Sequence, residues 1–132
     1  MNIGEIAVRT GLPAKTIRYY EGMGLIAPPR RSGGNYRVYD DRDLETLLFI
    51  QQARQLGFPI KEVAGLLQLW RDQGRSSADV HRLAVERMHQ IDSKIAELQR
   101  MRRTLETLVE RCHGDERPDC PILDKLAGGN IG

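Results

Sequence analysis

The residues best suited to chemistry are two cysteines near the C-terminal end, Cys112 and Cys120, eight positions apart. Thiolates are soft ligands that suit Cu(I), zinc and iron–sulfur clusters. Between them lie His113 and three acidic residues, Asp115, Glu116 and Asp119. Structural zinc takes four ligands and would have to recruit His113 and a carboxylate. Two sulfurs alone suit a monovalent d¹⁰ ion that accepts linear coordination, so both kinds of metal stay open at this point.

The two cysteines could instead form a disulfide or belong to an enzyme active site. A disulfide is geometrically possible, but in a reducing cytosol such a pair is more often metal-binding or redox-active than structural. An enzyme would need more: the chain has no C-x-x-C motif, no glycine-rich phosphate loop and no third group to orient a Cys–His pair. We therefore expect no enzyme activity. His81 and His89 are expected on the surface or seam of a helix, not as ligands.

The basic residues are concentrated at the other end of the chain. The net charge of the 132 residues is only +2, yet residues 1–39 hold six basic and two acidic side chains. Sixteen of the twenty basic residues are arginine, which suits bidentate recognition of phosphate and guanine. This distribution favours a polyanionic partner such as DNA.

The same segment predicts a helix-turn-helix. Two short helices are expected at residues 3–9 and 14–21, with Gly11 in the turn between them. In such a unit the second helix enters the major groove of DNA. Its candidate contact residues are Lys15, Thr16, Arg18, Tyr19 and Tyr20. For Tyr20 the alternative is a place in the hydrophobic core.

A small basic hairpin, called the wing, is expected at residues 28–39. Prolines stop the preceding helix, and Gly33-Gly34 supplies a turn between two short extended segments. The wing adds candidate backbone contacts from Arg30, Arg31, Tyr36 and Arg37.

Three more helices are expected after the wing. The first two cover residues 41–55 and 59–70 and pack on the helix-turn-helix, the former through a stripe of Leu44, Leu47, Leu48 and Phe49. The third runs from Ser76 or Ser77 to 111 without Pro or Gly, and its apolar residues follow heptad spacing with one local shift. A helix of roughly 50 Å cannot bury that stripe on so small a domain. We therefore expect a homodimer through this helix.

At this point the residues resemble the MerR-type bacterial transcription regulators. The resemblance covers the whole chain and is carried by TIRYYE at residues 16–21, GLI at 24–26, NYRVY at 35–39 and QARQLGF at 52–58. It implies a winged helix-turn-helix, an antiparallel pair of long helices and a C-terminal effector site. It also places Arg54 near a phosphate. It implies a palindromic operator in an overlong promoter spacer, which the effector-bound dimer distorts so that RNA polymerase can engage both promoter elements.

Within that family the C-terminal segment resembles the copper-efflux regulators of the CueR type. The likeness rests on both cysteines, on DCPI at residues 119–122 and on SSADV at 76–80. Relatives that sense divalent metals carry a third cysteine where this chain has Ser77, so the resemblance implies Cu(I), with Ag(I) or Au(I) as further effectors. A gold- or silver-preferring sensor, or a Cu(I) chaperone or buffer without a DNA role, is the alternative.

Together these patterns predict a mainly α-helical protein. We expect a winged helix-turn-helix DNA-binding domain at residues 1–70, a dimerisation helix at 76–111, and a metal-binding loop, short helix and tail at 112–132. No apolar run approaches the ~20 residues that a membrane span needs, and the first residues do not resemble a signal peptide. A cytoplasmic location without membrane contact is therefore expected.

Overall fold

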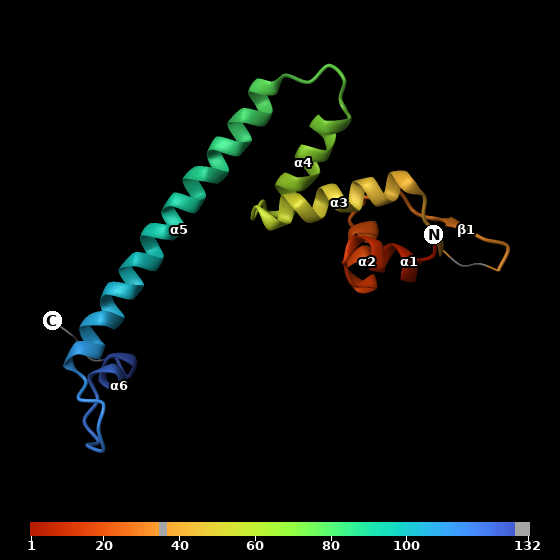
Figure 1. Cartoon of the computed structure of the whole chain (residues 1–132). Helices are drawn as coiled ribbons and strands as arrows, with labels where there is room; N and C mark the ends of the chain where they lie inside the picture. The colour runs from red at the N-terminus through yellow and green to blue at the C-terminus, as the bar shows by residue number, and fades with distance from the viewer. Residues whose placement is uncertain (35–36, 129–132) are drawn as a thin grey trace. The chain divides into compact units, whose positions relative to one another are not determined.

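The computed structural model describes residues 1–34 and 37–128 and is mainly α-helical, as predicted (Figure 1). Its elements are α1 (Ile3–Thr10), α2 (Ala14–Gly22), β1 (Arg30–Arg31), β2 (Arg37–Val38), α3 (Asp41–Gln55), α4 (Ile60–Arg71), α5 (Ser77–Arg111) and α6 (Pro121–Leu126). The chain divides into two compact units, residues 1–83 and 84–132. Tyr36, one of the predicted wing residues, lies outside the described residues.

Local signals in the sequence define both helices of the helix-turn-helix. The side chain of Asn2 caps α1, with its Oδ1 accepting a hydrogen bond from the backbone N–H of Glu5 at 2.8 Å. Gly11 ends the helix with φ 71°, a left-handed conformation that glycine adopts without steric cost. Pro13 then stands just before α2, where its missing N–H removes no helical hydrogen bond.

The core of the first unit forms between α1, α2, α3 and α4. Ile6, Ile17, Leu47, Ile50 and Val63 are all fully buried there. Figure 1 shows α3 between the α1–α2 pair and α4, in agreement with its packing contacts to α1 and α4. The helix-turn-helix is therefore held from one side by α3.

One predicted core position is wrong. Leu48 was expected on the buried stripe of α3, but 37% of its surface is exposed. Successive residues on an α-helix are about 100° apart, so the burial of Leu47 and Ile50 turns Leu48 outward. Leu44 and Phe49 are half-buried against the core.

A capping box begins α3 directly after the wing. Asp40 accepts a hydrogen bond from the backbone N–H of Asp43, and Asp43 accepts one from the N–H of Asp40. The hydrogen bond from Asp43 lowers the pKa of Asp40, whereas burial raises the pKa of Asp43. The folded state thus favours the ionised Asp40 at the start of the helix.

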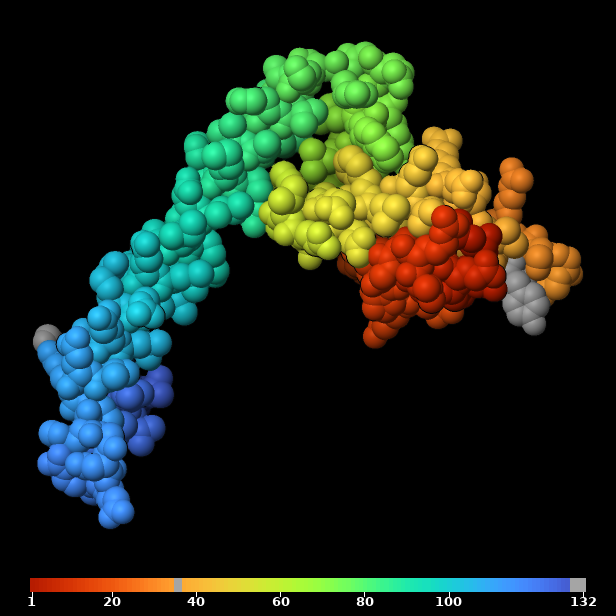
Figure 2. Space-filling view, viewed as in Figure 1, coloured from red at the N-terminus to blue at the C-terminus, as the bar shows by residue number. Residues whose placement is uncertain are grey.

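The wing is a two-stranded antiparallel ribbon, as predicted. Arg30 pairs with Val38 and Arg31 pairs with Arg37, and Gly33 and Gly34 lie in the turn. Both residues of β1 are exposed, as is Val38 in β2. Figure 2 shows this orange segment at the edge of the first unit. Apolar burial therefore does little to hold the strands.

Helix α5 runs for 35 residues and leaves its apolar seam uncovered. The exposed fractions are 60% for Met88, 38% for Ile91, 48% for Ile95, 51% for Leu98, 53% for Met101 and 54% for Leu105. Among the described residues of α5, Leu108 alone is buried. Figure 1 shows α6 folded back beside the last turns of α5, where Leu108 lies. None of the described helices combines the length and apolarity that crossing a membrane requires.

The packing of the core predicts how much stability is lost when the Ile17 side chain of α2 is shortened. Ile17→Ala should lower the free energy of unfolding by about 3 kcal/mol, because it leaves a cavity in a fully buried site. Val8→Ala is the control, since 84% of Val8 is exposed. Urea denaturation of both variants measures the difference, and an equal effect of the two would contradict the packing described for α2.

The exposed seam predicts an obligate dimer. Ile95→Glu places a charge in the middle of the seam and should convert the protein to a monomer or unfold it, because the charge would be buried in the dimer. Ser93→Glu is the matched control, since Ser93 lies on the opposite side of the helix. Sedimentation at micromolar concentration distinguishes these outcomes, and a folded wild-type monomer would exclude the predicted assembly.

Candidate functional site

Helix α2 separates a buried face from an exposed basic face. Ile17 and Tyr20 belong to the core, with Tyr20 only 7% exposed, which is the alternative that the sequence left open for it. Lys15 and Arg18 are exposed, and so is Tyr19 at 58%. Thr16 is half-buried. The exposed set shares one side of the helix and can reach a DNA groove.

The arginines of the wing differ in their surroundings. Arg30 and Arg31 are exposed on β1. Arg37 is half-buried, and its Nε lies 3.4 Å from Oε1 of Glu21. That Nε atom is buried and makes no hydrogen bond within residues 1–34 and 37–128, so its contact with Glu21 is ionic. Arg37 therefore has an internal partner that the sequence did not suggest.

Glu21 also binds Tyr39, which sequence reasoning missed. The hydroxyl of Tyr39 donates a hydrogen bond of 2.7 Å to Oε2 of Glu21. Burial is the main cause that raises the pKa of Tyr39 far above its usual value, and the bond to Glu21 adds to it. The positive charges of Arg37 and Arg18 act in the opposite direction. The structure thus brings one basic residue of α2, Arg18, and one of the wing, Arg37, near Tyr39 and its partner Glu21.

Arg54 has a structural contact at the end of α3. Its Nη1 donates a hydrogen bond of 2.8 Å to the carbonyl oxygen of Phe58. This bond spans the tight turn at Gly57, where φ is 83°. Arg54 is exposed, so its remaining N–H groups can face a phosphate.

The two cysteines lie at the ends of two helices in the second unit. Cys112 directly follows α5, and its N–H donates to the carbonyl of Leu108 at 3.0 Å. Cys120 is the N-cap residue of α6, followed by Pro121 in the first turn. Both are free thiols and half-buried.

The donor set of this loop fits a two-coordinate ion. Across the described ranges, no group of three or more His, Cys, Asp or Glu side chains is arranged to hold a metal. Asp115 accepts hydrogen bonds from Nε of Arg117 at 3.0 and 3.2 Å and from its backbone N–H at 2.9 Å. Recruiting Asp115 to zinc would disrupt these bonds. Among the candidate donors of the loop, the two sulfurs are half-buried, whereas His113 and the three carboxylates are exposed. Two thiolates suit a soft monovalent cation.

Ser77 and the cysteine loop are separated by the whole of α5. Ser77 is the first residue of the helix and Cys112 follows the last. At 1.5 Å per residue, this amounts to roughly 50 Å. Ser77 can therefore take part in a site at the loop only through a second chain.

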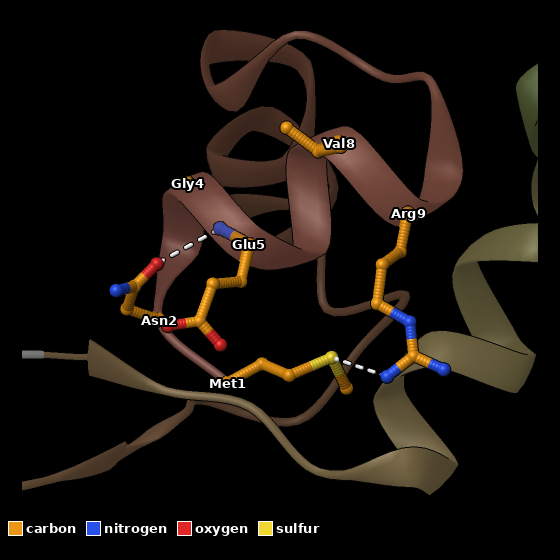
Figure 3. Close-up of a pocket in the computed structure, with 6 residues that line it drawn as sticks. All are labelled: Met1, Asn2, Gly4, Glu5, Val8 and Arg9. Atoms are coloured by element: carbon orange, nitrogen blue, oxygen red, sulfur yellow. Dashed lines mark hydrogen bonds between the residues drawn. The ribbon is translucent and has the colours of Figure 1, made fainter.

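The pocket beside α1 shows no comparable chemistry. Figure 3 shows it on the outer side of the helix, lined by Met1, Asn2, Gly4, Glu5, Val8 and Arg9. The two interactions drawn there are the cap from Asn2 to Glu5 and a 3.2 Å contact between Arg9 Nη1 and Met1 Sδ. Its polar groups thus bond to each other and to the start of the helix.

Comparison with known proteins decides the family. The family described as MerR HTH family regulatory protein matches residues 1–70, and the MerR DNA-binding family matches residues 44–108. The chain belongs to the MerR family. As a MerR-family protein it is a helix-turn-helix transcription regulator and not an enzyme.

Similar proteins include heavy metal-dependent transcription regulator 2 of Rhizobium meliloti (strain 1021), which is 48% identical over 98% of this chain and 88% of its own. The chain is 54% identical to the HTH-type transcriptional regulator HmrR of Rhizobium leguminosarum bv. viciae, over 98% of this chain and 99% of HmrR. It is 46% identical to CueR of Salmonella typhimurium, over 97% of this chain and 93% of CueR. A transcription regulator from Ralstonia metallidurans, solved with lead(II), has a TM-score of 0.81 at 33% identity and covers 96% of this chain and 98% of its own.

The exposed face of α2 predicts a DNA contact at Arg18. Arg18→Ala should weaken binding to the cognate operator by about 1 to 3 kcal/mol if the guanidinium makes a bidentate base contact. Arg100→Ala in α5 is the control, because it removes an exposed arginine outside the first unit. Fluorescence anisotropy at fixed salt measures both, and equal affinities of the Arg18 variant and the wild type would remove this assignment.

Proposed function

We propose that this MerR-family regulator activates copper-efflux or detoxification genes in response to Cu(I), with Ag(I) and Au(I) as further effectors. The observation that carries the proposal is the pair of half-buried free thiols at the two ends of one loop. Identity of about half with HmrR and CueR over nearly the full chain supports it. Its place of action is the bacterial cytoplasm, where the promoter DNA lies.

We assign one role to each part of the chain. Residues 1–70 bind a palindromic operator as a winged helix-turn-helix, with Lys15, Thr16, Arg18, Tyr19, Arg31, Tyr36, Arg37 and Arg54 as the candidate contacts and Tyr20 supporting them from the core. Residues 76–111 form the dimerisation helix, paired antiparallel with the same helix of a second chain. Residues 112–132 hold the effector.

Metal selectivity follows from the number of sulfurs. Cys112 and Cys120 of one loop supply two thiolates, which satisfy a monovalent d¹⁰ ion. Ser77 of the second chain stands near the loop in an antiparallel dimer and offers no third thiolate. Zinc usually takes four ligands, so a dry site with two sulfurs leaves it under-coordinated.

The response to metal is a change of shape in the DNA-bound dimer. Cys112 at the end of α5 and Cys120 at the start of α6 would hold the ion, and their joint coordination would order the loop between them. This shifts the dimer between two forms that differ in affinity for the metal and in how they bend the promoter for RNA polymerase. Copper therefore changes transcription without releasing the protein from its operator.

Removing one thiol tests the site. Cys112→Ala and Cys120→Ala should abolish copper-activated transcription while operator affinity stays within about twofold of wild type, because the substitutions lie outside the DNA-binding unit. The measurement is transcription from the cognate promoter in buffered free Cu(I), with a gel shift on the same DNA. A full Cu(I) response of Cys120→Ala rules out the two-sulfur site. Cu(I) binding without any operator binding points to a chaperone or buffer.

Adding a thiol tests the selectivity. Ser77→Cys should allow a transcriptional response to Zn(II) or Hg(II), because it supplies a third sulfur. Ser76→Cys is the control, since it adds a thiol one residue earlier, before the helix begins. Each variant is titrated with Cu(I), Ag(I), Au(I), Zn(II) and Hg(II). Activation of the wild type by Zn(II) as strongly as by Cu(I) contradicts the assignment.

A further inference from the structure

The two strands of the wing have little apolar packing of their own. The residues of β1 are exposed, and 39% of the surface of Val38 in β2 is exposed. A hollow of 540 Å³ separates β2 from the start of α1, lined by Met1, Asn2, Glu5, Ser32, Arg37 and Val38. Tyr39, which directly follows β2, is 1% exposed and anchors the end of the wing in the hydrophobic core, and the polar contacts around it add to that anchor.

Those contacts gather at the end of β2. The backbone of Tyr39 pairs with that of Met1, with N···O distances of 2.6 and 2.7 Å in the two directions. The hydroxyl of Tyr39 then donates to one oxygen of Glu21, and Nε of Arg37 faces the other. Only 13% of the Glu21 side chain is exposed, so this carboxylate is shielded from water and its contacts are strengthened.

Glu21 also lies near one basic residue of α2 and one of the wing. It lies in the last turn of α2, three positions after Arg18 and therefore on a neighbouring part of the same helix face. Both Arg18 and Arg37 are close enough to Tyr39 to influence its pKa. An acidic residue here lowers the positive potential of a DNA-binding face. We therefore expect Glu21 to favour DNA binding in another way that outweighs this effect.

We propose that Glu21 is a positioning residue for DNA binding: its carboxylate fastens the wing to the end of α2 and thereby fixes the spacing between Arg18 and Arg37. This inference rests on the proposed function, in which α2 and the wing bind one operator. Glu21 itself does not contact DNA. By holding Arg37 of the wing beside the end of α2, it keeps Arg37 and Arg18 in the register that operator recognition requires.

The experiment compares specific with non-specific binding by the full-length dimer. The wild type first selects an operator from a pool of random duplexes, and a scrambled duplex of the same composition serves as the non-specific probe. Anisotropy titrations at fixed salt give both affinities for each variant, and circular dichroism monitors folding. If the wild type selects no sequence, the proposed function and this inference both fail. If it does select one, the variants test Glu21 alone.

Glu21→Ala should weaken operator binding about tenfold, because it removes a charge-assisted contact and an ion pair that position the wing. Affinity for the scrambled duplex should stay the same or rise, because a negative charge has been removed from the DNA-binding face. An equal rise in affinity for both duplexes shows that Glu21 merely repels phosphates, which overturns the proposal. An unchanged operator affinity also overturns it. Glu45→Ala, which removes an exposed carboxylate from α3, is the matched control and should leave the ratio unchanged.

Tyr39→Phe gives a second, independent readout. It removes only the hydroxyl and should weaken operator binding about threefold in the wild-type background. In a protein that already carries Glu21→Ala, it should have no further effect. Additive effects overturn the proposed coupling. If Glu21→Ala does not fold, Glu21→Gln takes its place: the amide oxygen still accepts from Tyr39, while the ion pair with Arg37 is lost. A loss of about threefold in affinity for the operator, with no loss for the scrambled duplex, supports the proposal. An unchanged operator affinity overturns it.

Discussion

Burial of one face of α2 is the constraint on which the DNA-binding side of the protein depends. Ile17 is fully buried in the core of the first unit, where α2 packs against α1, and Tyr20 follows one turn later. At 100° per residue, burying these two positions leaves Lys15, Arg18 and Tyr19 on the opposite side. The helix cannot rotate without exposing Ile17, so the orientation of the basic residues follows from packing.

The course of the helices could be predicted because their ends are marked by local chemistry. Gly11 and Pro13 delimit the turn, and Ser76 precedes α5, where its Oγ accepts a hydrogen bond from the N–H of Ala78 at 3.2 Å. The assignment of Leu48 failed because several adjacent leucines fit a helical stripe equally well. Only the packing of α3 on two other helices selects among them.

The contacts of Glu21 could not be predicted for a different reason. They join residues 16 and 18 positions apart in sequence and require both α2 and the wing to be in place. The one available signal was an acidic residue within an otherwise basic surface. For the cysteines the opposite holds: residue type alone indicates soft-metal chemistry, and the structure adds that each sulfur stands at a helix end. Their metal remains a proposal.

In the second unit, folding and assembly are linked. Along α5 the apolar seam is about half exposed until Leu108, where the chain turns back. A helix with such a seam is stabilised by a partner more than by its own propensity. Ser77 can approach a cysteine loop only from a second chain, so the selectivity proposed for the site is a property of the dimer.

The small size of the wing has a consequence for its motions. Strands of two residues each, with exposed side chains, have few contacts that must break before they open. Such segments lie at the low end of local opening free energies, far below helices such as α3 that surround a buried core. The backbone amides of β1 and β2 should therefore exchange hydrogen with solvent without global unfolding, and DNA should slow that exchange. Part of the free energy of binding then offsets the ordering of these strands, which makes recognition sensitive to temperature as well as to sequence.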